Sequence, residues 1–307
     1  MPEPHTFFEV TCRTFQSRLL LRPSVELNEL ILGVVGRALS KYPIKLYCFV
    51  VLSNHQHLIL SAPDAKTIAD FMCYLNGNLA KEAGRLHHWK EKFWSRRYSA
   101  IAILDDESLI NRVHYLLSHG CKEGLVARPG DWPGVHCIGA LAYGHKLIGR
   151  WFARTLEYEA RSHGQTIKKN QFSFTYEVAL TPLPCFASLS RKEQQARWRQ
   201  LISDVEIETR ERLERDGRQV MGREKILSQD PHARPERSKR SPRPFCHAVE
   251  QTTIKVFKEA YEIFVAAYRQ AQALLTKGDP RSLSMFPDDC YLPPLALRLS
   301  QATFSSG

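Results

Sequence analysis

The sequence predicts an α+β protein in which an antiparallel sheet with helices on one face is followed by a mostly helical region. Three observations support this prediction. Short runs rich in β-branched and aromatic residues alternate with longer stretches of helical spacing between residues 5 and 125. Two of the short runs are separated only by the turn residues Ser53 and Asn54, which indicates a hairpin. Beyond residue 190, two long stretches have the pattern of helices.

The first strand and the first helix have clear boundaries. The apolar and aromatic run HTFFEVTCR (5–13) is typical of a short strand. Residues 23–42 predict a helix, because Pro23 and Ser24 are start signals and the apolar residues that follow have helical spacing. Pro43 ends this helix, since the residue before a proline disfavours helical dihedrals.

The next elements are two apolar strands joined as a hairpin, a long helix with an apolar stripe, a fourth strand and a last helix. They cover residues 44–52, 55–62, 65–86, 96–104 and 105 onward. The last helix begins with acidic residues, which suit a helix amino terminus, and is expected to end near Gly120 or Gly124. The resulting order, β-α-β-β-α-β followed by one more helix, is that of the ferredoxin-like fold.

We expect a first domain over residues 1–150, which closes after the turn-rich RPGDWPGVHC, and a basic accessory region over residues 151–307. In the accessory region, residues 190–220 predict a charged amphipathic helix and residues 249–278 predict a strong helix ending at Gly278. Residues 228–247 are rich in proline and arginine and lack periodicity, so they predict an extended segment or linker.

The charge of the chain points towards polyanions. The formal net charge is +11, and both halves contribute to the excess of lysine and arginine. A basic surface favours nucleic acid first and an anionic membrane second. No apolar run is long enough to span a membrane and the amino terminus lacks a signal peptide, so a cytoplasmic, nucleoid-associated protein without membrane contact is expected. The eight cysteines form no CxxC pair, which argues against a zinc finger and a disulfide framework.

The stretch SNHQHLIL (53–60) places two histidines two residues apart in a predicted strand. Because residues i and i+2 of a strand project from the same face, His55 and His57 point the same way. Two neighbouring imidazoles form a natural bidentate metal site. The alternative, two hydrogen-bonded histidines in a sheet, is equally compatible with this pattern alone.

A tyrosine and a third histidine lie four residues apart in the last predicted helix of the domain. Tyr115 and His119 therefore share one helix face. If this helix packs across the sheet, His119 can complete a site of three histidines with Tyr115 beside it. On its own, the pair is better explained by a core tyrosine and a surface histidine near a helix end.

Together, three segments resemble a known family. YCFVVLSNHQHLIL is similar to the HUH motif of the single-tyrosine transposases, and specifically of the REP-associated tyrosine transposases, whose strand usually reads close to MPNHVHLL. FWSRRYSAI (93–101) is similar to the Trp-x-x-Arg-Tyr segment of that family. YLLSHGCKEGLV (115–126) aligns without a gap with its YIHLNPVRAGLV segment. The resemblance covers roughly residues 5–135 and implies the HUH endonuclease fold.

The resemblance assigns roles to individual residues. It implies that Tyr115 is the nucleophile and that His55, His57 and His119 are the metal ligands. Two positions depart from the family pattern. Gln56 occupies the usually hydrophobic middle position of the motif, on the face opposite the histidines. His119 and Gly120 replace an Asn-Pro pair, which changes the type of the third ligand.

The implied function is metal-dependent cleavage and strand transfer of single-stranded DNA, next to DNA hairpins, through a covalent 5′-phosphotyrosine. The implied cofactor is Mg²⁺ or Mn²⁺, and the imidazole-rich ligand set favours Mn²⁺. A domesticated HUH nickase and a catalytically inactive DNA-binding protein are the alternative functions, and a homodimer remains open.

DNA contacts are expected from residues beside the fourth strand. Arg96 and Arg97 offer phosphate contacts and Tyr98 offers a stacking face, although a solvated strand end explains them as well. The segment from Arg234 to Arg243 holds five basic residues against Glu236, and is either a non-specific grip on the DNA backbone or a solvated linker.

Overall fold

The computed structural model describes residues 6–168, 170–235, 244–288, 290 and 292, and its centre is a four-stranded sheet. The strands lie in the order β2-β3-β1-β4, and every neighbouring pair is antiparallel. Their bounds are Phe7–Arg13 (β1), Lys45–Leu52 (β2), His55–Ser61 (β3) and Ser99–Ile103 (β4). The predicted α+β fold class is therefore confirmed.

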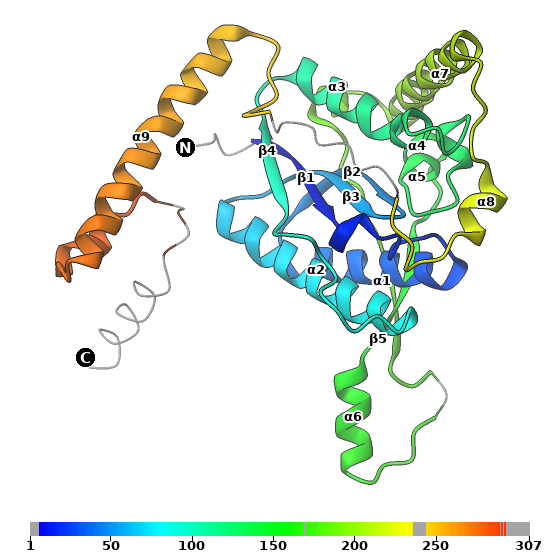
Figure 1. Cartoon of the computed structure of the whole chain (residues 1–307), viewed down its shortest axis with the longest axis horizontal. Coiled ribbons are helices and arrows are strands. Elements are labelled where there is room, and N and C mark those ends of the chain that lie inside the picture. The colour runs from blue at the N-terminus through cyan, green and yellow to red at the C-terminus, as the bar shows by residue number, and fades with distance from the viewer. Residues whose placement is uncertain (1–5, 169, 236–243, 289, 291, 293–307) are drawn as a thin grey trace.

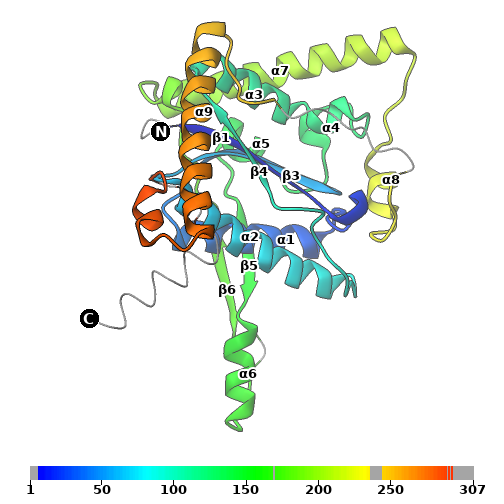
Figure 2. The ribbon, with the colours of Figure 1, turned by 60° about the vertical axis from the view of Figure 1, so that its left-hand side comes forward.

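Two helices, α1 (Val25–Lys41) and α2 (Ala65–Leu86), lie together on one face of this sheet (Figure 2). Each begins where a side chain accepts a hydrogen bond from a free backbone N–H. Ser24 accepts one from Leu27 at the start of α1, and Asp64 accepts one from Thr67 at the start of α2. The chain thus completes the predicted β-α-β-β-α-β unit, whose two helices share one face.

The other face of the sheet is covered by the helices that follow β4. Figure 2 shows α3 (Asp106–Leu117), α5 (Ile138–Tyr143) and α7 (Arg191–Asp216) on this side. α3 contacts β2, and α7 contacts both α3 and α5. Because both faces are covered, every residue of β3 is buried, including the polar residues His55, Gln56, His57 and Ser61.

The helix that carries Tyr115 is shorter than expected. We expected one helix from residue 105 to near Gly120 or Gly124, whereas α3 ends at Leu117 and the single turn α4 (His119–Lys122) follows. Ser118 separates the two, and its hydroxyl donates to the carbonyl of Tyr115 at 3.0 Å. Such a local bond competes with the regular helix ladder, which accounts for the break.

The second half is mostly helical, as predicted, but it also contains a hairpin that the sequence analysis missed. The hairpin consists of β5 (Ile148–Phe152) and β6 (Ser173–Glu177), and the predicted domain boundary at residue 150 falls inside β5. β5 packs directly on the backbone of α1. A Cβ atom added at Gly33 of α1 would lie 2.1 Å from the carbonyl oxygen of Arg150, so only glycine permits this contact.

Two parts of the second half project from the body, as Figure 1 shows. One is the hairpin with α6 (Arg154–Ser162), and the other is α9 (Gln251–Thr276), which packs with the short helix η4 (Pro280–Met285). None of the described helices is long and apolar enough to cross a membrane.

The predicted helices of the second half are present, and the predicted linker is described only in part. α7 matches the helix expected over residues 190–220, and α9 matches the one expected over residues 249–278. Before the linker, α8 (Arg223–Ser228) ends where the proline- and arginine-rich segment begins. Residues 236–243 lie outside the described residues, and with them most of the basic segment from Arg234 to Arg243.

Candidate metal centre and tyrosine site

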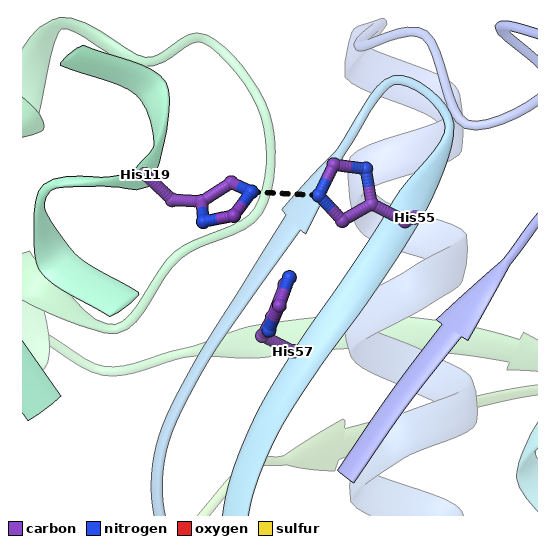
Figure 3. A group of neighbouring side chains, drawn as sticks. All are labelled: His55, His57 and His119. Carbon is purple, nitrogen blue, oxygen red and sulfur yellow. Dashed lines mark hydrogen bonds between the residues drawn. The ribbon is translucent and has the colours of Figure 1, made fainter. Parts of the chain in front are cut away.

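Three histidines from two separate elements converge on the α3 side of the sheet. His55 and His57 project from the same face of β3, and His119 begins α4. Their ligand nitrogens all lie within 4.8 Å of one another. In Figure 3 the rings of His55 and His119 face each other, with their Nε2 atoms 2.7 Å apart, and the ring of His57 is directed towards this pair. This arrangement could hold one metal ion.

A buried carboxylate fixes the orientation of His57. Nδ1 of His57 lies 3.0 Å from Oε1 of Glu9, a residue of β1 that is only 3% exposed. Arg112 of α3 contacts both oxygens of Glu9, at 2.9 Å each. Burial would raise the pKa of Glu9, but the hydrogen bonds of His247 and His57 and the charges of His57 and Arg112 hold it well below its usual range. His57 therefore donates from Nδ1 and keeps Nε2 for the centre of the cluster.

The three imidazoles fit the demands of a metal site. Burial is the largest cause that holds the pKa of His55 and the pKa of His119 well below 6.5, and the charge of His57 is the next. Both rings are therefore neutral, and each has a nitrogen lone pair that can bind a metal. The carboxylate behind His57 is the support that metal-bound histidines commonly have.

In the metal-free protein, these depressed pKa values predict a loss of stability in acid. Below about pH 6.5 the unfolded chain binds protons at both histidines while the folded chain does not. Stability therefore falls below pH 6.5, by up to roughly 1.4 kcal/mol per pH unit for each histidine, and is unaffected above it. Denaturant unfolding in EDTA between pH 7 and pH 5.5 measures this slope. His119→Asn should reduce it, and an equal slope in both proteins would contradict the expectation.

Tyr115 lies beside the histidine cluster, at the end of α3. Its ring centroid is 5.1 Å from that of His119 and 5.9 Å from that of His57. The guanidinium of Arg112 lies over the ring at 3.9 Å, and the ammonium of Lys122 lies 4.9 Å from the ring centroid. Burial raises the pKa of Tyr115, and the charge of Arg112 opposes this change.

A polar cleft of about 380 Å³ opens next to Tyr115, between α3 and α7. Its α3 side includes Asn111, and Lys122 of α4 also lines it, whereas its α7 side includes Arg212 and Arg215. The second half of the chain thus forms one wall of the space that reaches the tyrosine. The lining also includes Glu208 and Glu211, so side chains of both charges face the cleft.

The predicted DNA contacts lie near the sheet but not within the histidine cluster. Arg96 and Arg97 are exposed. The backbone next to them is held against the end of β1, where Ser95 N–H donates to the carbonyl of Arg13. Tyr98 is half-buried, and its ring packs against the core near Asp70 and Cys73 of α2. The structure therefore brings Tyr115 and the three histidines together and leaves Tyr98 on the α2 side.

Several residues around the cluster were not predicted from the sequence. Glu9 is a charge in the middle of an apolar strand, and this pattern alone marks a buried carboxylate that needs partners. Arg112 lies three residues before Tyr115, on the same helix face, so the helical period could have identified it. Arg13, exposed and directly opposite His55 in the β1–β3 register, depends on strand pairing. His247 contacts Glu9 from the far end of the chain, and no local signal predicts it.

The first half of the chain resembles transposases. Residues 18–119 match the model of the family described as IS200-like transposases. Among solved structures, a REP-associated tyrosine transposase bound to a REP hairpin is 19% identical over 43% of this chain and 76% of its own, with a TM-score of 0.37. A candidate transposase from Deinococcus radiodurans R1 is 16% identical over 38% of this chain and 92% of its own, with a TM-score of 0.29. No curated protein matches the chain significantly. The family match confirms the resemblance found in the sequence, and over residues 18–119 this chain is similar to the IS200-like transposases.

Proposed function

We propose that this protein cleaves and rejoins single-stranded DNA next to hairpins, through a covalent bond between Tyr115 and a 5′-phosphate. One observation carries the proposal. The imidazoles of His55, His57 and His119 converge beside Tyr115 in a chain whose residues 18–119 match the IS200-like transposases. The match supports a transposase-like DNA enzyme, and the cluster adds a metal-binding centre and a nucleophile in contact with it.

In the proposed reaction, the hydroxyl oxygen of Tyr115 bonds to the phosphorus while the bond from phosphorus to the 3′-oxygen breaks. The 3′-oxygen leaves as a hydroxyl group and takes up the proton that the phenol has lost. The tyrosine ester keeps the energy of the phosphodiester bond, because one ester has replaced another. Attack by a 3′-hydroxyl of another strand can therefore reverse the step and join that strand without ATP.

The side chains around Tyr115 support this chemistry. When bound at the three histidines, a divalent cation would neutralise charge on the scissile phosphate and polarise it. Arg112 and Lys122 lie over the tyrosine ring, so their positive charges favour loss of the phenol proton, which prepares the oxygen for attack. Glu9 holds His57 by its Nδ1 and keeps Nε2 of this ring directed at the cluster.

For the cofactor we propose Mn²⁺ or Mg²⁺, with Mn²⁺ favoured. Imidazole nitrogen suits softer cations better than Mg²⁺, which prefers oxygen ligands. His119→Asn replaces one nitrogen ligand with an amide oxygen and should shift the preference towards Mg²⁺. We expect the ratio of the cleavage rates in Mg²⁺ and Mn²⁺ to rise by roughly tenfold, about 1.4 kcal/mol of differential binding. An unchanged ratio in metal titrations would show that His119 does not contact the metal.

For the substrate we propose single-stranded DNA beside a hairpin, with Arg96 and Arg97 as phosphate contacts. Both side chains are exposed. Alanine at both positions should weaken binding and reduce the slope of log affinity against log salt by about 1.4, since each phosphate contact on a single strand contributes about 0.7. Lys66→Ala is the matched control, because Lys66 is an exposed cation on α2, where it pairs with Asp70. Equal slopes for the double variant and the native protein would exclude Arg96 and Arg97.

Two alternatives remain beside the strand transferase. A domesticated nickase would form the covalent adduct but would not join it to a second strand, and a DNA-binding protein without activity would form no adduct. The presence of Tyr115 in contact with the histidine cluster favours an active enzyme over the inactive one.

The test is incubation of the purified chain with Mn²⁺ and a labelled single strand that contains a hairpin. A protein–DNA adduct that survives denaturing electrophoresis is expected, together with a free 3′-hydroxyl fragment. Addition of a second strand with a free 3′-hydroxyl should release the adduct as a joined product. Binding without an adduct under all metal conditions would contradict the proposed activity.

A further inference from the structure

We propose that His247, from the second half of the chain, is a positioning residue for the metal centre. Through Glu9 it holds His57 in the orientation that presents Nε2 to the cluster. This inference rests on the proposed metal site and extends it to a segment that lies beyond the family match at residues 18–119. It also gives the region before α9 a role in the chemistry of the first half.

The backbone around His247 is fixed at the free edge of the sheet. His247 N–H donates to the carbonyl of Ala102 at 2.8 Å, and Leu104 N–H donates to the carbonyl of His247 at 2.9 Å. These bonds form a parallel bridge to Ile103 of β4, and Figure 1 shows this segment passing beside β4 on its way to α9. His247 therefore occupies a defined position next to β4, which itself pairs with the strand that carries Glu9.

The same segment also reaches the helix that carries Tyr115. Val249 N–H donates to Oδ2 of Asp105 at 2.8 Å. Asp105 is the amino-terminal cap of α3, where its Oδ1 accepts from Ser108 N–H at 2.6 Å. One short segment thus contacts both supports of the candidate site, the edge of the sheet and the start of α3.

His247 completes the environment of a buried carboxylate. Nε2 of His247 lies 3.0 Å from Oε2 of Glu9, and its side chain is only 12% exposed. Oε1 of Glu9 is contacted by His57 and by Arg112, whereas Oε2 is contacted by Arg112 and His247. Each oxygen therefore lies within 3.0 Å of two side-chain nitrogens. Loss of His247 would leave Oε2 with Arg112 alone.

The geometry points to a positioning role because Glu9 controls which nitrogen of His57 is available. A carboxylate held on both oxygens cannot rotate, and its Oε1 then fixes Nδ1 of His57 as the donor. Arg112 also contacts both oxygens, so loss of His247 leaves Oε2 with a single side-chain partner and loosens the hold on the carboxylate that orients His57. Partners behind metal-bound histidines commonly change metal affinity by about 10- to 100-fold when they are removed.

The experiment measures metal binding by the full-length, metal-stripped chain. Mn²⁺ affinity is determined by calorimetry, and Co²⁺ is added separately because its visible spectrum reports the ligand arrangement. His247→Ala should weaken Mn²⁺ binding by about 10- to 100-fold and change the Co²⁺ spectrum. His247→Gln retains a donor for Glu9 and should restore affinity to within a few-fold of the native value. His163→Ala, at an exposed histidine beyond α6, should bind as the native protein does.

The outcomes separate this inference from the proposed function. If His57→Ala weakens metal binding and His247→Ala leaves affinity and the Co²⁺ spectrum unchanged, His247 has no positioning role and the metal site stands. If the native chain binds no Mn²⁺, or if His57→Ala binds as tightly as the native chain, the metal site itself is wrong and the inference falls with it. Equal losses in the alanine and glutamine variants, with native unfolding temperatures, would also overturn the positioning role.

Discussion

Tyr115→Phe is expected to eliminate the covalent DNA adduct and to reduce strand cleavage by at least about 10³-fold, because the substitution removes the only proposed nucleophile. The change deletes one oxygen from a half-buried ring that contacts His57, His119 and Arg112. The phenylalanine ring preserves these contacts, so folding and metal affinity should stay near the native values. Denaturing electrophoresis after incubation with Mn²⁺ and a labelled hairpin-bearing strand measures the loss.

A second tyrosine controls for general effects of losing a phenol. Tyr143 lies in α5 with 59% of its surface exposed, so Tyr143→Phe should cleave and form the adduct as the native protein does. Mass spectrometry of the native adduct should place the nucleotide on the peptide that contains Tyr115. Undiminished adduct formation by Tyr115→Phe would show that the nucleophile is another residue and that the alignment of YLLSHGCKEGLV with the family is wrong.

The fold of the first half could be predicted because its signals are local. Ser24 and Asp64 cap α1 and α2, and Asp105 caps α3, in each case at the residue before the apolar spacing begins. The hairpin between β2 and β3 follows from a two-residue turn between two apolar runs. Where a boundary was wrong, a local side-chain bond decided it: the hydroxyl of Ser118 bonds the carbonyl of Tyr115, and α3 ends there.

The histidine pair and its third member could also be predicted, but their support could not. Strand parity places His55 and His57 on one face, and helical spacing links Tyr115 to His119. Glu9, by contrast, reaches His57 across the register of β1 with β3, which a single sequence does not specify. His247 reaches Glu9 from more than 200 residues away, so only the folded chain brings them together.

In the second half of the chain, the helices could be predicted from the sequence, whereas the elements placed by tertiary contacts could not. Its helices α7 and α9 have strong periodic patterns, and both were expected. The hairpin β5–β6 is formed by strands of five residues each. In β5 the buried residues are Gly149 and Trp151 while Ile148 is exposed, so the sequence shows no alternation of apolar and polar residues. Its position depends on the contact between β5 and α1 at Gly33, a tertiary contact without a local signal. The wall that α7 contributes to the cleft beside Tyr115 is likewise a product of packing alone.

His57→Ala is the second substitution with a large expected effect, and we expect it to weaken metal binding and to suppress cleavage. The loss removes one of three converging nitrogens, so the remaining pair should hold the cation more weakly. Cleavage should fall by at least about 10³-fold, as is typical when charge stabilisation at the reacting phosphate is removed. DNA binding should persist, since none of the exposed arginines is changed.

We chose His57 rather than His55 for this substitution because the two rings have different contacts. His57 bridges the buried charge of Glu9 and the cluster, whereas His55 bonds only Asn54 and His119 in the described part of the chain. In His57→Ala, Glu9 keeps Arg112 and His247 as partners, so the carboxylate stays neutralised and the fold should survive. Calorimetry with Mn²⁺ and the adduct assay at rising Mn²⁺ concentration distinguish two outcomes. If cleavage stays absent at every Mn²⁺ concentration, His57 is a metal ligand whose position the reaction requires. If the variant cleaves at the native rate and binds Mn²⁺ with the native affinity, His57 has only a structural role in the sheet and is not a metal ligand.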